Sequence, residues 1–231
     1  MRHPDTINGV DVPYSSTEEE LIENIRNDNQ AKWSSFIALG NKNSEKSIEF
    51  LLSCLSSEDW RIRRAALEAA KYHEHLSEHV DAVVKALKDT SAYVIREACL
   101  TIGDVALSDL HEEVFLLLSS KDDNTRANSM YAIDKIWQDT DYNKVLEIFF
   151  SDTDIDNRRR AAQILFNHAN INTWQQLFDL WKNDSLGRHR MWACKLATVF
   201  GLSSVIADIE KLKNDPDGHV RKAAQESLKN G

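Results

Sequence analysis

The sequence contains little of what interrupts helices or anchors a chain in a membrane. Only 7 of its 231 residues are glycine and 3 are proline, so turns should be short and few. Three cysteines, Cys54, Cys99 and Cys194, are too few for a disulfide framework, and their helical positions predict buried free thiols. No apolar run approaches the roughly 20 residues of a membrane span, and residues 1–5 lack a secretion signal's apolar core. We therefore expect a helical, cytoplasmic protein with no membrane partner.

The chain instead repeats one short phrase at nearly constant spacing. A basic residue recurs seven times, and small residues follow it in the clearest copies, at residues 62–66 (IRRAA), 158–162 (RRRAA) and 220–224 (VRKAA). The repeated basic residues are Lys32, Arg63, Arg96, Arg126, Arg159, Arg190 and Arg221. A period of about 31 residues along the whole chain is typical of stacked helix pairs, in which each repeat contacts only its neighbours.

The spacing of apolar residues predicts an outer and an inner helix in every repeat. We expect outer helices near 17–27, 44–56, 77–88, 109–119, 141–151, 172–183 and 203–214. We expect inner helices, which carry the repeated phrase, near 29–40, 58–73, 91–106, 122–137, 154–169, 186–200 and 217–229. Residues 1–16 should form an irregular lead-in and residues 17–231 a single array. The predicted fold is all-α, with an extended surface rather than a central pocket.

Hydroxyl and acidic residues precede the expected helix starts. Ser16 or Thr17 lies three residues before a glutamate, which is the spacing of a capping box. An aspartate precedes the phrase in several repeats, at Asp28, Asp59, Asp122 and Asp217. We expect these carboxylates to cap the inner helices and to meet the arginine of an adjacent repeat, which would tie the stack together.

The phrase and its flanks resemble a known repeat family. Residues 215–224 (DPDGHVRKAA) are similar to the inner-helix motif of HEAT repeats, in the short form shared with phycobilisome-lyase-type repeats, and residues 57–66 match it nearly as well. The resemblance covers residues 17–230 and implies a right-handed α-solenoid of about seven HEAT-like hairpins, whose inner helices line a concave face. Trp192 departs from the motif, which has a small residue there. Because the family has no single activity, the resemblance implies architecture and leaves function open.

Charge is divided unevenly between the two expected layers. The inner-helix segments hold 17 Lys/Arg and 12 Asp/Glu, in a chain whose net charge is −9. The inner layer is therefore the basic side of an acidic protein, and it could attract an acidic partner surface. The arginines are also part of the repeated motif, so a purely structural role stays open.

Counting along each phrase selects the positions expected to face the concave side. The candidate partner-binding residues are Arg64, Glu68, Glu97, Tyr131, Asp134, Arg160, Asn167, Lys195 and Lys222, and the same count selects Lys71 and Asp104. Their mixed charges suit a folded protein with an acidic or mixed surface better than a uniform polyanion. Trp60, beside Arg61, would be a further anchor if it is exposed.

Signals of catalysis or of a cofactor are weak. Residues 152–157 (DTDIDN) resemble the opening of a calcium loop, but they lack its final glutamate and run into three arginines, which favours a capped turn. His73, His75 and His79 belong to no recognisable metal-ligand spacing. We therefore expect no metal, no other cofactor and no catalytic residue.

The leading hypothesis is a non-enzymatic scaffold or adaptor that holds a folded protein in its concave groove, as a regulator or an immunity protein. Two alternatives stay open. One is a HEAT-like DNA glycosylase for alkylated bases, for which Trp137 and Asp141 are the arguable residues. The other is a lyase-type chaperone for a prosthetic group. The negative net charge opposes binding of duplex DNA, so nucleic acid is not the expected partner.

Overall fold

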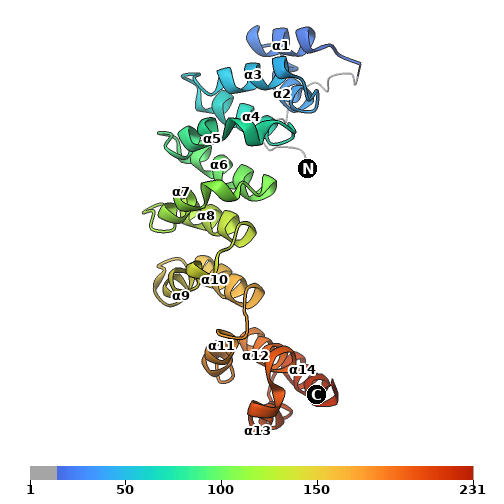
Figure 1. Ribbon diagram of the computed structural model, residues 1–231, viewed down its shortest axis with the longest axis vertical. Coiled ribbons are helices and arrows are strands. Elements are labelled where there is room, and N and C mark those ends of the chain that lie inside the picture. The colour runs from blue at the N-terminus through green and yellow to red at the C-terminus, as the bar shows by residue number, and fades with distance from the viewer. Residues whose placement is uncertain (1–14, 231) are drawn as a thin grey trace. The chain divides into compact units, whose positions relative to one another are not determined.

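Alternating helices make up the described chain in the computed structural model (Figure 1). The structure describes residues 15–230, so the expected lead-in over residues 1–16 lies almost entirely outside them. Contacts divide the chain into two compact units, the first ending at Asp141 and the second beginning at Tyr142. Each unit is described by itself below, and the continuity of one array across this boundary stays a prediction.

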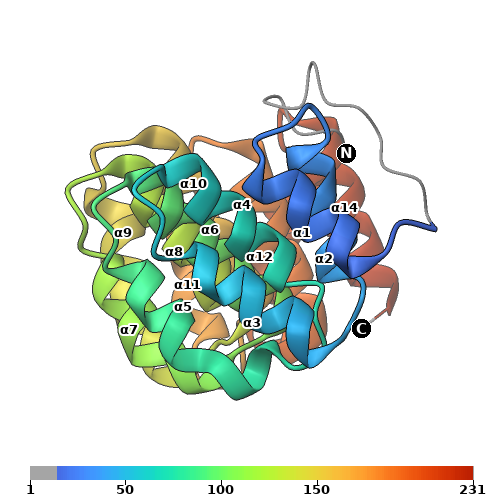
Figure 2. The same ribbon diagram turned by 90° about the horizontal axis from the view of Figure 1, so that it is seen from above.

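The first unit contains four helix pairs. Its outer helices are α1 (Glu18–Arg26), α3 (Glu45–Cys54), α5 (Val80–Leu87) and α7 (His111–Leu117). Its inner helices are α2 (Lys32–Gly40), α4 (Trp60–Ala70), α6 (Ala92–Val105) and α8 (Asp123–Lys135). The 3₁₀ turns η2 (Leu76–His79) and η3 (Ser108–Leu110) precede α5 and α7, and η4 (Asp139–Asp141) ends the unit. Each outer helix packs on the inner helix that follows it, and the inner helices stack in order; Figure 2 shows α5 and α7 on one side of α6 and α8.

The second unit contains three helix pairs. Its outer helices are α9 (Tyr142–Ser151), α11 (Trp174–Trp181) and α13 (Leu202–Leu212), and its inner helices are α10 (Ile155–Asn167), α12 (Gly187–Phe200) and α14 (Gly218–Asn230). Each outer helix again packs on the next inner helix, and α12 lies along α14. Every predicted helix is therefore confirmed, with ends that differ by a few residues, and the all-α solenoid is the observed fold class.

Apolar side chains between the two layers form the core of each unit. Leu51, Leu67 and Ile102 are completely buried in the first unit, as is Trp181 in the second. Burying one such side chain contributes roughly 1.5–3 kcal/mol relative to leaving it in water. At Gly40 the backbones of α2 and α4 approach closely, because a Cβ there would lie 2.1 Å from the Ala69 carbonyl oxygen.

Three of the four aspartates predicted to cap inner helices do so, whereas α6 and α12 begin without a side-chain cap. Thr17 and Glu20 form the predicted capping box of α1. Asp59 and Asp122 cap α4 and α8, and Asp217 accepts a hydrogen bond from the His219 amide at the start of α14. The prediction for Asp28 is wrong, because this residue has φ of 50° and pairs with Lys32, while α2 starts after Ala31 without a side-chain cap.

The structure also corrects the register of the repeat. The fourth residue of α4, α6, α8, α10, α12 and α14 is, in order, Arg63, Ile95, Arg126, Arg158, Arg190 and Arg221. Arg96 and Arg159, which the sequence pattern selects, lie one residue further along their helices. The selected surface positions Glu97, Arg160 and Asn167 are displaced by the same one residue, or about 100° around the helix. In α10, the run of three arginines at residues 158–160 hid this shift.

Trp192 changes the packing of the second unit, as its departure from the repeat motif suggests. Its ring is 5% exposed and stacks on Phe166 of α10 with ring centroids 5.0 Å apart. A hollow of about 330 Å³ lies beside it, lined by Arg159 of α10 and by Gly187 and His189 of α12. Here an aromatic ring occupies the space in which smaller residues would let two inner helices approach closely.

Candidate functional site: the inner-helix surface

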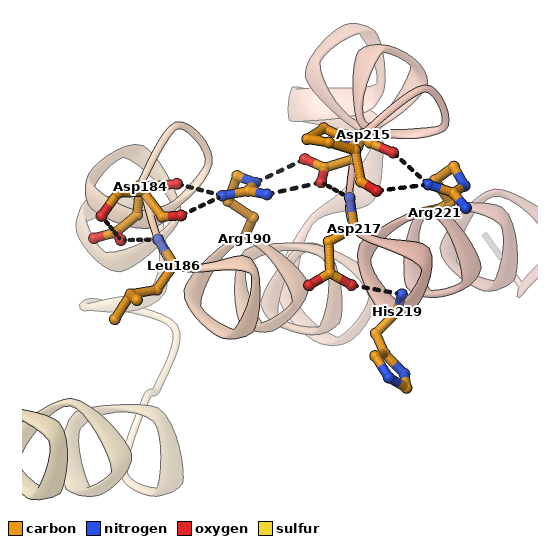
Figure 3. Close-up of polar contacts among 9 residues, drawn as sticks. Asp184, Leu186, Arg190, Asp215, Asp217, His219 and Arg221 are labelled. Carbon is orange, nitrogen blue, oxygen red and sulfur yellow. Dashed lines mark hydrogen bonds and ion pairs between the residues drawn. The ribbon is translucent and has the colours of Figure 1, made fainter.

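One arginine position closes the turn before each inner helix that carries it. Arg63, Arg126, Arg158, Arg190 and Arg221 each donate from Nη1 to carbonyl oxygens five or six residues earlier, at 2.5–3.3 Å. In Figure 3, Arg190 reaches back to the turn at Asp184, and Arg221 does the same at Asp215. These carbonyl groups follow the outer helices and have few other partners, so the arginines fix the turns.

Two of these arginines also bind an aspartate of the following repeat. Arg63 holds both carboxylate oxygens of Asp89 at 2.7 Å. Arg190 holds those of Asp215 at 2.7 and 2.8 Å, as Figure 3 shows. All four side chains are at most 13% exposed. Arginine–aspartate ties between repeats are therefore present, but the prediction assigned them to the wrong acids, because Asp89 and Asp215 stand two residues before the capping position.

The next joint of the first unit lacks both members of the pair. Ile95 occupies the arginine position of α6, and Ser120 occupies the position of the acid before α8. An arginine or aspartate without its partner would leave an unpaired, partly buried charge between two repeats, which would lower stability. The absence of both residues together therefore fits a paired role.

These pairs carry a dependence on pH. The Arg63 guanidinium lowers the pKa of Asp89, and Arg190 lowers the pKa of Asp215. A carboxyl group whose pKa falls on folding stabilises the protein above its unfolded-state pKa of about 4. That contribution is lost as the pH drops through the lowered folded-state pKa. Acid should therefore weaken both joints.

A second set of polar side chains joins three inner helices of the first unit, and we call it the inner-face network. It consists of Arg64 and Glu68 on α4, Lys71 directly after α4, Glu97 and Asp104 on α6, and Tyr131 on α8. Arg64 lies 3.5 Å from Glu97 and 3.8 Å from Glu68. Lys71 lies 3.8 Å from Glu97 and 3.2 Å from Asp104, to which the Tyr131 hydroxyl donates a hydrogen bond. Sequence analysis selected all six positions, and the structure brings them together.

Burial separates the members of this network. Glu97 has a side chain only 8% exposed, between α4 and α6, and burial followed by the nearby Glu68 charge raises its pKa. Burial alone would lower the pKa of Lys71, but Glu97 and Asp104 outweigh it and raise that pKa. Glu97 and the 17%-exposed Arg64 therefore serve packing between helices more than an open surface, which corrects the expected exposure of both.

Tyr131 and Asp104 form the more accessible end of the network. The Asp104 side chain is 37% exposed, and its hydrogen bond raises the pKa of Tyr131 to about 12, with a smaller contribution from the negative charge of Asp134. Asp134 itself is half-buried on α8. Gly103 allows this arrangement, because a Cβ there would lie 2.7 Å from the Tyr131 ring. The result is a neutral phenol held beside a carboxylate.

The remaining predicted residues lie on the second unit, where they are exposed. Each inner helix of this unit carries more than one exposed cation, and the predicted ones are Arg160 of α10, Lys195 of α12 and Lys222 of α14. Lys222 lies 3.8 Å from Glu226, with both side chains more than half exposed, so water screens this pair. Asn167 is also exposed and accepts a hydrogen bond from Gln163 at 2.9 Å.

The three thiols, and the acid considered for a glycosylase, are poorly placed for covalent chemistry. Burial raises the pKa of Cys54 to about 11 and those of Cys99 and Cys194 to about 12, so the thiols stay protonated at neutral pH. Cys99 and Cys194 are buried as predicted, whereas Cys54 is only half-buried. Asp141, the candidate acid of a glycosylase, is fully buried, and both its oxygens lie 2.9 Å from His111 Nε2.

The sequences that resembled ion sites are structural turns. Asp152 accepts the Asp154 amide and Asp154 caps the Asn157 amide, both at 2.8 Å, as in the expected capped turn. His73 is buried against the Ser44 carbonyl, 3.0 Å away. Within residues 15–230 no group of three or more potential metal ligands gathers, and no helix there is long and apolar enough to cross a bilayer.

Comparison with known proteins decides the kind of fold. No family profile matches the chain, and no curated protein matches it. The crystal structure of the archaeal HEAT-like repeats protein from Thermococcus onnurineus NA1 matches 95% of this chain and 98% of its own, with a TM-score of 0.59 at 15% identity. The fold is that of a HEAT-like repeat protein.

Two further structures share this HEAT-like fold. One belongs to the complex of CpcE and CpcF of phycocyanin lyase from Nostoc sp. PCC7120, with a TM-score of 0.57, 15% identity, and coverage of 95% of this chain and 89% of that one. The other is an engineered protein, with a TM-score of 0.58, 18% identity, and coverage of 92% and 67%. At these identities the likeness shows architecture alone.

Proposed function

We propose that this protein is a non-enzymatic scaffold or adaptor that binds a folded protein along its inner helices. The observation that carries the proposal is that every inner helix of the second unit presents exposed cations, among them Arg160, Lys195 and Lys222. Exposed charges of this kind steer association and select partners without a covalent step. We expect the partner surface to be acidic or mixed.

The inner-face network of the first unit supports the same kind of partner. Lys71, Asp104 and Tyr131 combine a cation, an anion and a hydroxyl on neighbouring helices. A surface of mixed charge suits the irregular pattern of charges on a folded protein, whereas a uniform polyanion would meet the Asp104 and Glu68 carboxylates. The three free thiols further lead us to place the protein in a reducing compartment such as the cytoplasm.

A charge-reversal variant tests this proposal. Arg64 should stay unchanged, because a glutamate there would face the buried Glu97 and could harm folding. The variant Arg160→Glu, Lys195→Glu, Lys222→Glu changes only exposed residues. We expect near-normal helical circular dichroism and association with the native partner slowed about tenfold, with a weaker dependence on salt.

The matched control makes the same charge change on outer helices. Lys46 of α3, Lys85 of α5 and Lys211 of α13 are exposed, and the pairs that Lys46 and Lys211 make with acids are screened by solvent. The partner would first be identified by affinity purification from the native host and mass spectrometry, then measured by surface plasmon resonance. Equal slowing by both triple variants would indicate an effect of net charge and would count against an inner-helix binding face.

A further inference from the structure

Two aromatic rings form an exposed stack at the start of two neighbouring inner helices. Trp60 is the first residue of α4 and Tyr93 the second of α6, and their ring centroids are 4.6 Å apart. Tyr93 is 52% exposed and Trp60 is half-buried. Large aromatic rings held rigidly at a surface are the residues that most often dominate the energy of a protein interface.

An arginine flanks each ring. The Arg61 guanidinium lies 5.0 Å from the Trp60 ring centroid, and the Arg96 guanidinium lies 5.8 Å from that of Tyr93. Arg61 is 58% exposed and reaches Asp59 only at 3.6 Å. We call these four residues, Trp60, Arg61, Tyr93 and Arg96, the aromatic–arginine platform. Its rings orient the arginines by cation–π contact, which leaves their N–H groups able to donate elsewhere.

Arg96 lacks the acceptor that its counterpart one repeat earlier possesses. Arg64, the fifth residue of α4, lies 3.5 Å from Glu97, the sixth residue of α6. The sixth residue of α8 is the uncharged Asn128, whose amide donates to the Asn124 carbonyl. Arg96 Nε is buried without a hydrogen-bond acceptor, and Arg96 forms no ion pair among residues 15–230. Arg96 is half-buried and pairs with no acidic side chain there, so its guanidinium remains available to an acceptor from a partner.

The chemistry of the platform favours a carboxylate from a protein. The two arginines can donate hydrogen bonds to one or two carboxylates, while the two rings contact the apolar part of an adjoining side chain. A nucleic acid carries a charge at every nucleotide, and Glu58, Asp59 and the net charge of −9 would oppose such a run of phosphates. One face of each ring is also unavailable for stacking on a base, because Trp60 and Tyr93 stack on each other.

We infer that the aromatic–arginine platform is an anchor site for an acidic segment of a protein partner. A glutamate or aspartate of that segment accepts from the half-buried Arg96 guanidinium and from Arg61, and the exposed ring of Tyr93 packs on the neighbouring residue. The inference rests on the proposed function for the existence of a protein partner, but it uses none of the residues tested there.

Nuclear magnetic resonance of the full chain tests the anchor. The probe is a short peptide of alternating glutamate and glycine, and the matched probe carries glutamine instead. We expect the acidic peptide to shift the Trp60 indole and Arg96 Nε–H signals, and the glutamine peptide to leave them in place. Arg96→Gln and Tyr93→Ala should each weaken the peptide about tenfold, because both remove a central contact. Arg188→Gln, the same change at an exposed arginine of α12, should not.

Three outcomes would overturn the inference. They are unchanged Trp60 and Arg96 signals with the acidic peptide, undiminished binding to Arg96→Gln, and tighter binding of single-stranded RNA through the same signals. The variant Arg160→Glu, Lys195→Glu, Lys222→Glu separates the two proposals, because it should still bind the peptide. If it loses the native partner while Tyr93→Ala and Arg96→Gln keep full affinity, the inner-helix proposal stands and the anchor is wrong. If instead Tyr93→Ala and Arg96→Gln lose the native partner while the triple variant keeps full affinity, the anchor is supported and the inner-helix proposal is wrong.

Discussion

Replacing Asp141 with alanine is expected to lower the free energy of unfolding by about 3 kcal/mol. The Asp141 carboxylate is fully buried, with both oxygens 2.9 Å from His111 Nε2, and it also accepts the Gln138 amide at 2.9 Å. Alanine would leave the imidazole of His111, only 4% exposed, and this amide without an acceptor in the core. Urea denaturation followed by circular dichroism measures the loss.

The neighbouring Asp139 supplies the control for this prediction. It belongs to the same 3₁₀ turn, η4, but is exposed. Asp139→Ala should change the free energy of unfolding by no more than about 0.5 kcal/mol, as surface substitutions usually do. If the two variants were equally stable, the His111–Asp141 pair would contribute nothing to the fold of the first unit.

Arg190→Met is expected to cost a similar amount, about 3 kcal/mol, at neutral pH. It leaves the Asp215 carboxylate, 5% exposed, without its bidentate partner, and it frees the Asp184 and Ser185 carbonyls. Arg221→Met is the matched control, because Arg221 closes its own turn through the Asp215 and Pro216 carbonyls and is exposed. Loss of the hydrogen bonds that Arg221 donates to those neutral carbonyls should cost only about 1 kcal/mol.

The pH dependence gives this prediction a second test. Arg190 lowers the pKa of Asp215, so its stabilisation is present above the unfolded-state pKa of about 4 and disappears as the pH falls below the folded value. The difference in free energy of unfolding between wild type and Arg190→Met should therefore shrink on acidification. A difference that stays constant between pH 7 and strongly acidic conditions would show that the ion pair is not its source.

The architecture was predictable from the sequence because its signals are local. Helical spacing and caps depend on residues within a few positions of each other, as in the box formed by Thr17 and Glu20. Asp28 misled the same reasoning, since a left-handed backbone at that residue keeps its carboxylate from capping α2. Local rules therefore place helices correctly while they fail at single turns.

The contacts between repeats were predictable only in kind. An arginine–aspartate tie between repeats was expected. Which aspartate pairs with a given arginine, such as Asp89 with Arg63, depends on how one repeat is rotated relative to the next. The network positions were found from periodicity, whereas the burial of Glu97 reflects a one-residue shift in α6 that the phrase at residues 95–99 does not reveal. The Tyr93–Arg96 half of the platform had no signal, because nothing local marks a missing carboxylate at Asn128.

Site-specific photocrosslinking to the native partner tests the central claim of an inner-helix binding face most directly. A photoreactive side chain would replace Lys195 on inner helix α12 and, in a separate variant, Lys211 on outer helix α13; both residues are exposed. We expect irradiation to join the partner to the protein labelled at position 195 and not to the protein labelled at 211. Crosslinking from position 211 alone would contradict the account and would move the binding surface to the outer helices.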